Sequence, residues 1–209
     1  MGFRPNQTNM KQATRKDKAR ALEILAKTFD EVQGIKWVVN CNEHKEERLR
    51  ALAEYAFEKS FLRNGVFLSD DETGVALFYR NNAKGNLFLD IVNEVKLIFK
   101  AISISRIPEI LKRESYRSKL RPQKQDYYYF WMFGVIDEGK GRGSASELKN
   151  ALLKKAEDEG LPIYAETSIE RNCKVYERMG FQLYHYWEVK AQDIQLWFVK
   201  REFASINPF

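Results

Sequence analysis

Cysteine and histidine are scarce in this chain, and their scarcity excludes several kinds of site. The 209 residues include two cysteines, Cys41 and Cys173, and two histidines, His44 and His185. Two cysteines do not make the disulfide framework of a small secreted domain, and the wide separation of the histidines leaves no metal-ligand spacing. We therefore expect no bound metal ion, and a reducing, cytoplasmic setting is the default.

Long apolar runs are also missing. No stretch approaches the roughly 20 residues that a membrane helix needs, so we expect no membrane partner. The N-terminus lacks the apolar centre of a secretory signal. Internal repeats, low-complexity segments and clear linkers are absent as well, and we expect one domain over residues 1–209.

The charge is basic but mixed. The net charge is +6, with 31% charged and 44% hydrophobic residues, which suits a packed globular core. Basic character is compatible with nucleic acid or with a polyanionic cofactor. The basic residues are interleaved with acids, which favours a solvated surface and no nucleic-acid partner. The same interpretation applies to one basic segment, made of Lys112, Arg113, Arg117, Lys119, Arg121 and Lys124.

Helical and strand patterns alternate along the chain, as in an α/β protein. Thr14 and Asp17 fit a capping box that opens a helix, which Gly34 ends. The other expected helices lie at about 43–63, 87–102, 108–120, 145–159 and 172–179. The expected strands lie at 65–68, 75–79, 126–135, 161–167, 181–189 and 194–200, and residues 8–13 could form a further short strand. The aromatic run at 127–131 could stack nucleic-acid bases, but strand alternation sends such rings into a core more often.

The most informative segment holds three glycines at alternate positions. Gly139, Gly141 and Gly143 stand between the aromatic strand and a helix. Glycine permits tight turns and close approach to a ligand, and the first turn of a helix offers unpaired N–H groups at its positive end. The segment therefore predicts an anion site, most often one for a phosphate.

Two well-known phosphate motifs fail here. The dinucleotide fingerprint ends in Gly or Ala, yet its last position falls on Ser144 or Ser146. A Walker A loop fits Gly134 through Lys140, but Gly141 stands where a magnesium-binding hydroxyl is required. No aspartate follows at the end of an apolar strand to complete that site.

A third motif fits better. The run Glu138, Gly139, Lys140, Gly141, Arg142 and Gly143 resembles the [QR]-x-x-G-x-[GA] pyrophosphate loop of the GNAT superfamily of N-acetyltransferases. Downstream, Asn172, Tyr176, Gly180 and Phe181 resemble the family's N-x-x-x-Y-x-x-x-G-F segment. Within the superfamily, the puromycin N-acetyltransferase-like branch is the most similar. Glu138 departs from the usual Gln or Arg.

The resemblance implies a fold and an activity. The fold would be a mixed, mostly antiparallel twisted sheet flanked by helices, with a helical insert at about 87–120 and a cofactor-binding half at about 126–200. The activity would be acetyl transfer from acetyl-CoA to a primary amine of a small molecule, by direct attack in a ternary complex. A protein or peptide N-acetyltransferase and a non-catalytic nucleotide- or CoA-binding module remain alternatives, and a homodimer remains open.

The resemblance also assigns site residues. The expected cofactor-binding residues are Phe133, Gly134, Val135, Gly139, Lys140, Gly141, Arg142, Gly143, Ser144 and Asn172. Asn172 and Tyr176 share one helix face, and a tyrosine with a pKa of about 10 suits protonation of a leaving thiol. Glu166 is the candidate general base, with a structural carboxylate as an equal alternative.

Overall fold

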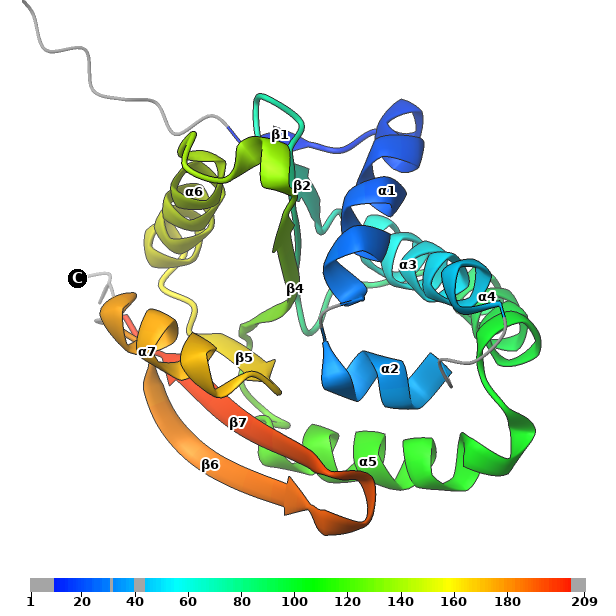
Figure 1. Cartoon of the computed structure of the whole chain (residues 1–209). Helices are drawn as coiled ribbons and strands as arrows, with labels where there is room; N and C mark the ends of the chain where they lie inside the picture. Colours follow the sequence, from blue (N-terminus) through cyan, green and yellow to red (C-terminus); the bar gives the residue numbers. More distant parts are fainter. Residues whose placement is uncertain (1–9, 31, 40–43, 204–209) are drawn as a thin grey trace, which may run out of the picture.

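The structure is a computed structural model that describes residues 10–30, 32–39 and 44–203. Cys41 and the start of the expected second helix at Glu43 lie outside these residues. The described chain forms one twisted sheet with helices on both of its faces (Figure 1). No helix in these ranges is long and apolar enough to cross a membrane.

The sheet has seven strands in the order β1-β2-β3-β4-β5-β7-β6. Their bounds are β1 Lys11–Gln12, β2 Val66–Leu68, β3 Gly74–Arg80, β4 Tyr128–Val135, β5 Ile163–Thr167, β6 Gln182–Val189 and β7 Ile194–Arg201. Every neighbouring pair is antiparallel except β4 and β5, which are parallel. The predicted mixed, mostly antiparallel sheet is therefore confirmed.

Seven α-helices surround this sheet in the described chain. They are α1 Lys18–Phe29, α2 Gln33–Val39, α3 Lys45–Phe61, α4 Leu87–Ala101, α5 Ile107–Leu120, α6 Ser144–Asp158 and α7 Glu170–Arg178. Helices α1 and α3 bury their apolar faces against one side of β2, β3 and β4, and α6 packs on the other side (Figure 1). Helix α5 lies against β6, where the rings of Tyr116 and Trp187 meet at a tilt of 35°, with their centroids 4.2 Å apart.

The start of the first helix is as predicted, but its end is not. Thr14 and Asp17 form the capping box, with the Thr14 amide donating to Asp17 at 2.7 Å. The helix ends at Phe29, whereas Gly34, the predicted stop, is the second residue of α2. Gly34 is buried, and a β-carbon there would lie 3.6 Å from the Ser168 hydroxyl. These are ordinary contact distances, so Gly34 lies inside a helix without ending one, and a small side chain would fit there.

The sheet opens between its two central strands. Strands β4 and β5 pair only from Tyr128 to Phe130, opposite Ile163 to Ala165. Beyond this point the register of β4 against β3 shifts, so that Leu77 faces Met132 while Phe78 faces Phe130. Trp131 is therefore the extra residue of a β-bulge, which bends a strand and increases its twist. From the bulge onward β4 continues along β3 alone, and one of its edges is released.

Candidate functional site: a cavity at the opening of the sheet

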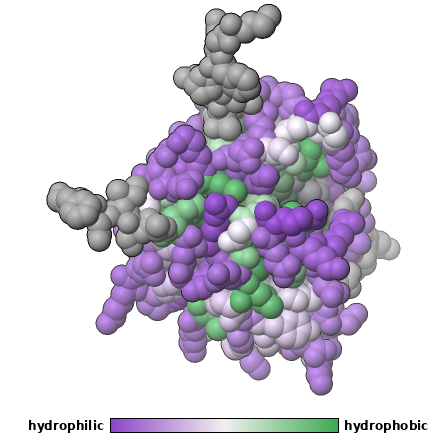
Figure 2. Space-filling view, turned by 90° about the vertical axis from the view of Figure 1, so that its left-hand side faces the viewer, coloured by the Kyte–Doolittle hydropathy of each residue, from purple (hydrophilic) through white to green (hydrophobic). Residues whose placement is uncertain are grey.

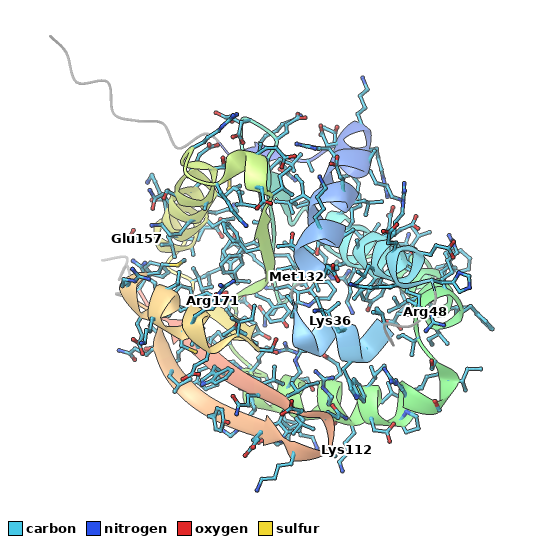
Figure 3. The ribbon with its side chains drawn as sticks, viewed as in Figure 1. Lys36, Arg48, Lys112, Met132, Glu157 and Arg171 are labelled. Atoms are coloured by element: carbon cyan, nitrogen blue, oxygen red, sulfur yellow. The ribbon has the colours of Figure 1, made fainter. Side chains whose placement is uncertain are left out.

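A cavity of about 1260 Å³ occupies the opening between β4 and β5. Its wall includes β4 from Phe130 to Val135 and β5 from Glu166 to Thr167, and it extends to α1, α2, α4, α5, α7 and the first turn of α6. In Figure 3, Met132 of β4 lies near the middle of the molecule, between α7 and the helices α1 and α2. Figure 2 shows the face of the molecule that carries α6 and α7, where hydrophilic residues surround hydrophobic ones near the middle.

The structure brings six of the predicted site residues to this cavity. They are Phe133, Gly134, Val135, Glu166, Asn172 and Tyr176. The glycine loop, residues 139–143, lies beside the cavity without lining it, and Ser144 is buried behind it. The wall there is formed by Ala145 and Ser146, which follow the loop and were not predicted. They could have been found, because a helix presents its first-turn amides whatever their side chains.

The glycine loop leaves several backbone donors available. Gly141 and Gly143 have φ of 79° and 98°, in the left-handed region that glycine tolerates. A β-carbon on either would meet no atom within 4 Å, so the space above the loop is open. In the described chain, the amides of Gly141, Gly143, Ser144 and Ala145 have no hydrogen-bond acceptor. These donors converge at the positive end of α6, which is an anion-binding arrangement.

The loop is fixed from behind by a buried polar cluster that the sequence did not reveal. The hydroxyl of Ser144 donates to Asp71 at 2.8 Å and lies 3.0 Å from the hydroxyl of Thr73. Burial alone would raise the pKa of Asp71, but hydrogen bonds from Ser69, Ser144 and Thr73 hold it well below its ordinary value. Ser144 is thus anchored through its side chain, which leaves only its amide for a ligand.

Gly139 serves packing, not conformational freedom. A β-carbon there would lie 2.0 Å from the Thr73 hydroxyl oxygen, so any side chain would push the loop off its anchor.

The charged residues of the loop are exposed. Lys140 pairs with Asp137 at 2.6 Å, and Glu138 points toward Lys27 of α1 at 4.0 Å. The unusual carboxylate of Glu138 is therefore directed to a lysine and away from the free amides.

The released edge of β4 offers a second set of donors. The Ile136 amide donates to Thr73, the residue directly before β3, at 3.0 Å. Because antiparallel strands alternate hydrogen-bonded and non-hydrogen-bonded pairs, the Gly134 amide also bonds to β3, while those of Phe133 and Val135 face the opening. Gly134 has another function: a β-carbon there would lie 2.2 Å from the Thr28 hydroxyl oxygen. The absence of a side chain lets α1 approach β4.

Asn172 and Tyr176 extend from α7 to the opposite wall of the cavity. The Asn172 side-chain amide donates to the Thr167 hydroxyl at 3.3 Å, at the end of β5. The ring of Tyr176 meets Phe130 and Phe181 edge-on, at centroid distances of 6.4 and 5.1 Å. Burial raises the pKa of Tyr176 well above its ordinary value. Its phenol is therefore protonated throughout the neutral range.

Glu166 does not face the cavity as an isolated carboxylate. Arg121 donates to one of its oxygens at 2.9 Å, Arg117 donates to the other, and the Tyr129 hydroxyl approaches at 3.3 Å. Only 6% of the Glu166 side chain is exposed. Burial alone would lower the pKa of Arg117, but Glu166 beside it raises the value above the ordinary one. This geometry favours the structural alternative for Glu166, because each oxygen already accepts from an arginine.

The basic segment on α5 is not the solvated helix face that its pattern predicted. Arg113, Arg117 and Arg121 turn inward and line the cavity, although Lys112 and Lys119 are exposed. The expectation failed because the three arginines recur every four residues and so share one helix face, which the structure turns toward β5. Glu166, the partner of Arg117 and Arg121, is 49 and 45 residues away from them in the sequence.

Another part of the cavity wall is aromatic and apolar. Tyr79, Tyr129 and Trp131 meet edge-on or stacked, with Tyr55 edge-on to Trp131 at 6.1 Å. The aromatic run of β4 is therefore wall and core, as its alternation predicted. The helical insert adds an apolar group, made of Leu97, Ile98, Ile102, Ile107 and Ile110. In the described ranges, no group of His, Cys, Asp and Glu side chains could hold a metal ion.

Comparisons with known proteins agree with this geometry. Residues 102–181, less than half of the chain, match the acetyltransferase (GNAT) family. A solved structure described as histone acetyltransferase HPA2 and related acetyltransferase, from Corynebacterium glutamicum, is similar over 96% of this chain and 98% of its own, with 21% identity and a TM-score of 0.66. The structure of arylalkylamine N-acetyltransferase 2 from Aedes aegypti is similar over 93% of this chain and 98% of its own, with 16% identity and a TM-score of 0.65. A chain in the structure of the NatC complex bound to Gag peptide and CoA is similar over 94% of this chain and 98% of its own, with 12% identity and a TM-score of 0.51.

These likenesses show the fold, and the matched segment contains β4, the glycine loop, α6, β5 and α7. Residues 102–181 are thus similar to an acetyltransferase domain, the described chain has the GNAT fold, and the cavity lies where the sheet opens between β4 and β5.

Proposed function

Given this acetyltransferase domain, we propose that the protein transfers the acetyl group of acetyl-CoA to a primary amine of a small molecule, by direct attack in a ternary complex. One observation carries the proposal. The opening of the sheet beyond Phe130 forms a single cavity that reaches both the free amides at the start of α6 and the buried phenol of Tyr176. Acetyl-CoA supplies the acyl group there as an activated thioester.

The residues present suit the pyrophosphate of CoA. The amides of Gly141, Gly143, Ser144 and Ala145 lack internal acceptors and point with the α6 dipole toward one place. Arg142 is exposed beside them and can add a charge. The anchor through Asp71 and Thr73 holds these donors in position before a ligand arrives, which reduces the entropy lost on binding.

The released edge of β4 suits the pantetheine arm and the thioester. We assign the amides of Phe133 and Val135 as the donors, with Gly134 spacing α1 from the strand. An amide aimed at the oxygen of a reacting carbonyl stabilises the charge that develops there, and such a donor is worth about 3 kcal/mol in other enzymes.

Tyr176 is the proposed proton donor to the departing thiolate. Its raised pKa keeps the proton on the phenol, and its position on the cavity wall gives it access to the sulfur. Asn172, one turn earlier on α7, is placed to bond the cofactor arm while it holds Thr167 at the end of β5.

For Glu166 we propose a positioning role in place of proton abstraction. Its carboxylate draws Arg117 and Arg121 against the β5 side of the cavity and leaves no oxygen without an arginine. A substrate amine would have to displace one of these arginines before it could transfer a proton to Glu166.

The dimensions of the cavity support a small acceptor. Binding sites for small molecules usually measure about 300–1,000 Å³, and the cavity of about 1260 Å³ would hold a pantetheine arm together with one such acceptor. A peptide acceptor, as the Gag peptide bound by the NatC complex suggests, is the second candidate. Membership of the puromycin N-acetyltransferase-like branch, a homodimer and a cytoplasmic setting remain predictions.

Titration calorimetry tests the first half of the proposal. Acetyl-CoA and CoA should bind with 1:1 stoichiometry, and ATP should bind at least tenfold more weakly. Tighter binding of ATP would contradict the proposal and favour a nucleotide-binding module.

A thiol-release assay over a panel of amines and short peptides tests the second half. Release of CoA that depends on a small amine supports the proposal. Release only with peptides would favour the peptide alternative. Acetyl-CoA binding without release on any amine or peptide would favour a non-catalytic module.

A further inference from the structure

Arg113 is the one member of the arginine group on α5 that has no acidic partner. Arg117 and Arg121 each pair with both Glu114 and Glu166. Within the described residues Arg113 makes no hydrogen bond or ion pair, and its Nε and Nη1 are buried without a partner. The group therefore holds three guanidinium groups and two carboxylates, which leaves one positive charge uncompensated in the cavity wall.

The fold gives this charge little compensation. The Arg113 guanidinium lies over the ring of Trp37 at 5.1 Å, a cation–π contact that offsets only part of the cost of burying the charge. Burial lowers the pKa of Arg113 to about 10, so the side chain is still a cation at neutral pH. Native proteins seldom leave buried polar groups unpaired, because the hydrogen bonds that such a group made to water are then lost without replacement. A ligand that supplies an anion would remove this cost.

The position of Arg113 places that anion near the reacting groups. A β-carbon on Gly34 would lie 3.8 Å from the Arg113 Nη2 and 3.6 Å from the Ser168 hydroxyl oxygen. Ser168 directly follows Thr167, the residue that Asn172 contacts from α7. The unpaired guanidinium therefore lies on the α2 and β5 side of the cavity, whereas the free amides proposed for the pyrophosphate lie at the start of α6.

We propose that Arg113 binds a carboxylate of the acceptor, so that the preferred substrate is an amine that also carries a carboxylate group. The inference rests on the proposed acetyl transfer, whose acceptor it specifies. A planar guanidinium matches a carboxylate with two parallel hydrogen bonds, and one uncompensated charge balances one carboxylate. The aromatic wall beside it, with Tyr129 and Trp131, accommodates the rest of the acceptor.

Binding of simple probes tests the subsite without catalysis. Calorimetry compares 3-phenylpropionate, hexanoate, their uncharged amides and inorganic phosphate on the CoA-saturated protein. The carboxylates should bind at least tenfold more tightly than the amides, and Arg113→Met should abolish that difference. Lys112→Met is the matched control, because Lys112 is the neighbouring residue on the exposed side of α5 (Figure 3) and should leave it unchanged. Equal binding of carboxylates and amides, tighter binding of phosphate, or an equal effect of both variants would overturn the proposal.

Turnover with a matched pair of amines gives the second test. The wild-type kcat/KM should be at least tenfold higher for phenylalanine than for phenethylamine, which lacks only the carboxylate. Arg113→Met should lower the value for phenylalanine at least tenfold and leave that for phenethylamine within twofold, while Arg113→Lys should retain part of the preference. Acetyl-CoA affinity should stay the same in every variant. Preference for phenethylamine, with acetyl-CoA bound, would overturn this inference alone, whereas absence of acetyl-CoA binding would overturn the proposed function itself.

Discussion

The two ends of the cavity differ in what they offer a ligand. At the α6 end the donors are backbone amides, and glycines at 141 and 143 keep the space above them open. At the α5 end the polar groups are side chains, in which Glu166 binds Arg117 and Arg121 while Arg113 stays unpaired. We propose that the first end holds any ligand with a pyrophosphate, whereas the second distinguishes acceptors by charge.

This difference separates what a GNAT domain shares from what is particular to this chain. Backbone donors depend on chain path alone, so they can be the same in many proteins that share the fold. Side-chain groups such as Arg113 depend on which residues the helical insert brings inward. Substitutions at the two ends should therefore have different consequences for stability, catalysis and binding.

Replacing Glu166 should have the largest effect on stability. Glu166→Gln removes one carboxylate from a buried pair, and breaking such pairs costs about 3–5 kcal/mol. Glu114 still contacts both arginines, so we expect a loss near the lower limit, about 3 kcal/mol, in urea unfolding. If Glu166 is instead the general base, unfolding should change little while kcat falls.

A side chain at Gly134 should disturb the junction of α1 with β4. Gly134→Ala places a β-carbon 2.2 Å from the Thr28 hydroxyl oxygen and should cost about 2 kcal/mol of unfolding free energy. Thr28→Ala, combined with it, removes that oxygen and should recover part of the loss. A double variant no more stable than Gly134→Ala alone would show that the close approach is not the cause.

Removing the phenol of Tyr176 should affect catalysis more than binding. Tyr176→Phe should lower kcat at least tenfold, about 1.4 kcal/mol of barrier, with acetyl-CoA affinity within twofold of wild type. Unchanged kcat would exclude the acid role.

The buried phenol also has a signature in stability. Its pKa in the folded state is raised above the unfolded value of about 10, so its contribution is present below about pH 10 and is lost as the pH rises further. Tyr176→Phe should reduce the fall in unfolding free energy above pH 10. An identical alkaline profile in both proteins would show that the phenol is not buried as described.

The smallest expected effect is at Gly34, next to Arg113. Gly34→Ala adds a methyl group at ordinary contact distances inside α2, where alanine favours the helix by about 0.5–1 kcal/mol over glycine. Thermal unfolding should therefore shift upward slightly. A destabilised variant would mean that the space beside Arg113 is tighter than the structure shows.

The parts of the site predicted from sequence are those formed by neighbouring residues. The glycine loop, its helix, and the Asn172–Tyr176 spacing each lie within one short segment, and local geometry determines them. The capping box at Thr14 and the hairpin of β2 and β3 were predictable for the same reason.

The parts that were missed join residues far apart in the chain. Ser144 meets Asp71 across 73 positions, and Arg117 meets Glu166 across 49. Neither pairing has a sequence signature, because the sequence alone does not distinguish a charged residue that is buried from one that is exposed. Helix α2 was missed since Gly34, which lies inside it, was interpreted as a helix stop.

The central claim is that the glycine loop binds the pyrophosphate of acetyl-CoA. A matched pair of variants tests it most directly. Gly141 and Gly160 both have positive φ, 79° and 63°, and open space around them, but Gly160 lies beyond the other end of α6. Gly141→Asp and Gly160→Asp therefore introduce the same strain and charge at opposite ends of one helix.

Calorimetry with acetyl-CoA then separates the two. The account predicts at least tenfold weaker binding to Gly141→Asp, since its carboxylate repels the pyrophosphate, and binding within twofold of wild type for Gly160→Asp. Equal affinities of the two variants for acetyl-CoA would contradict it.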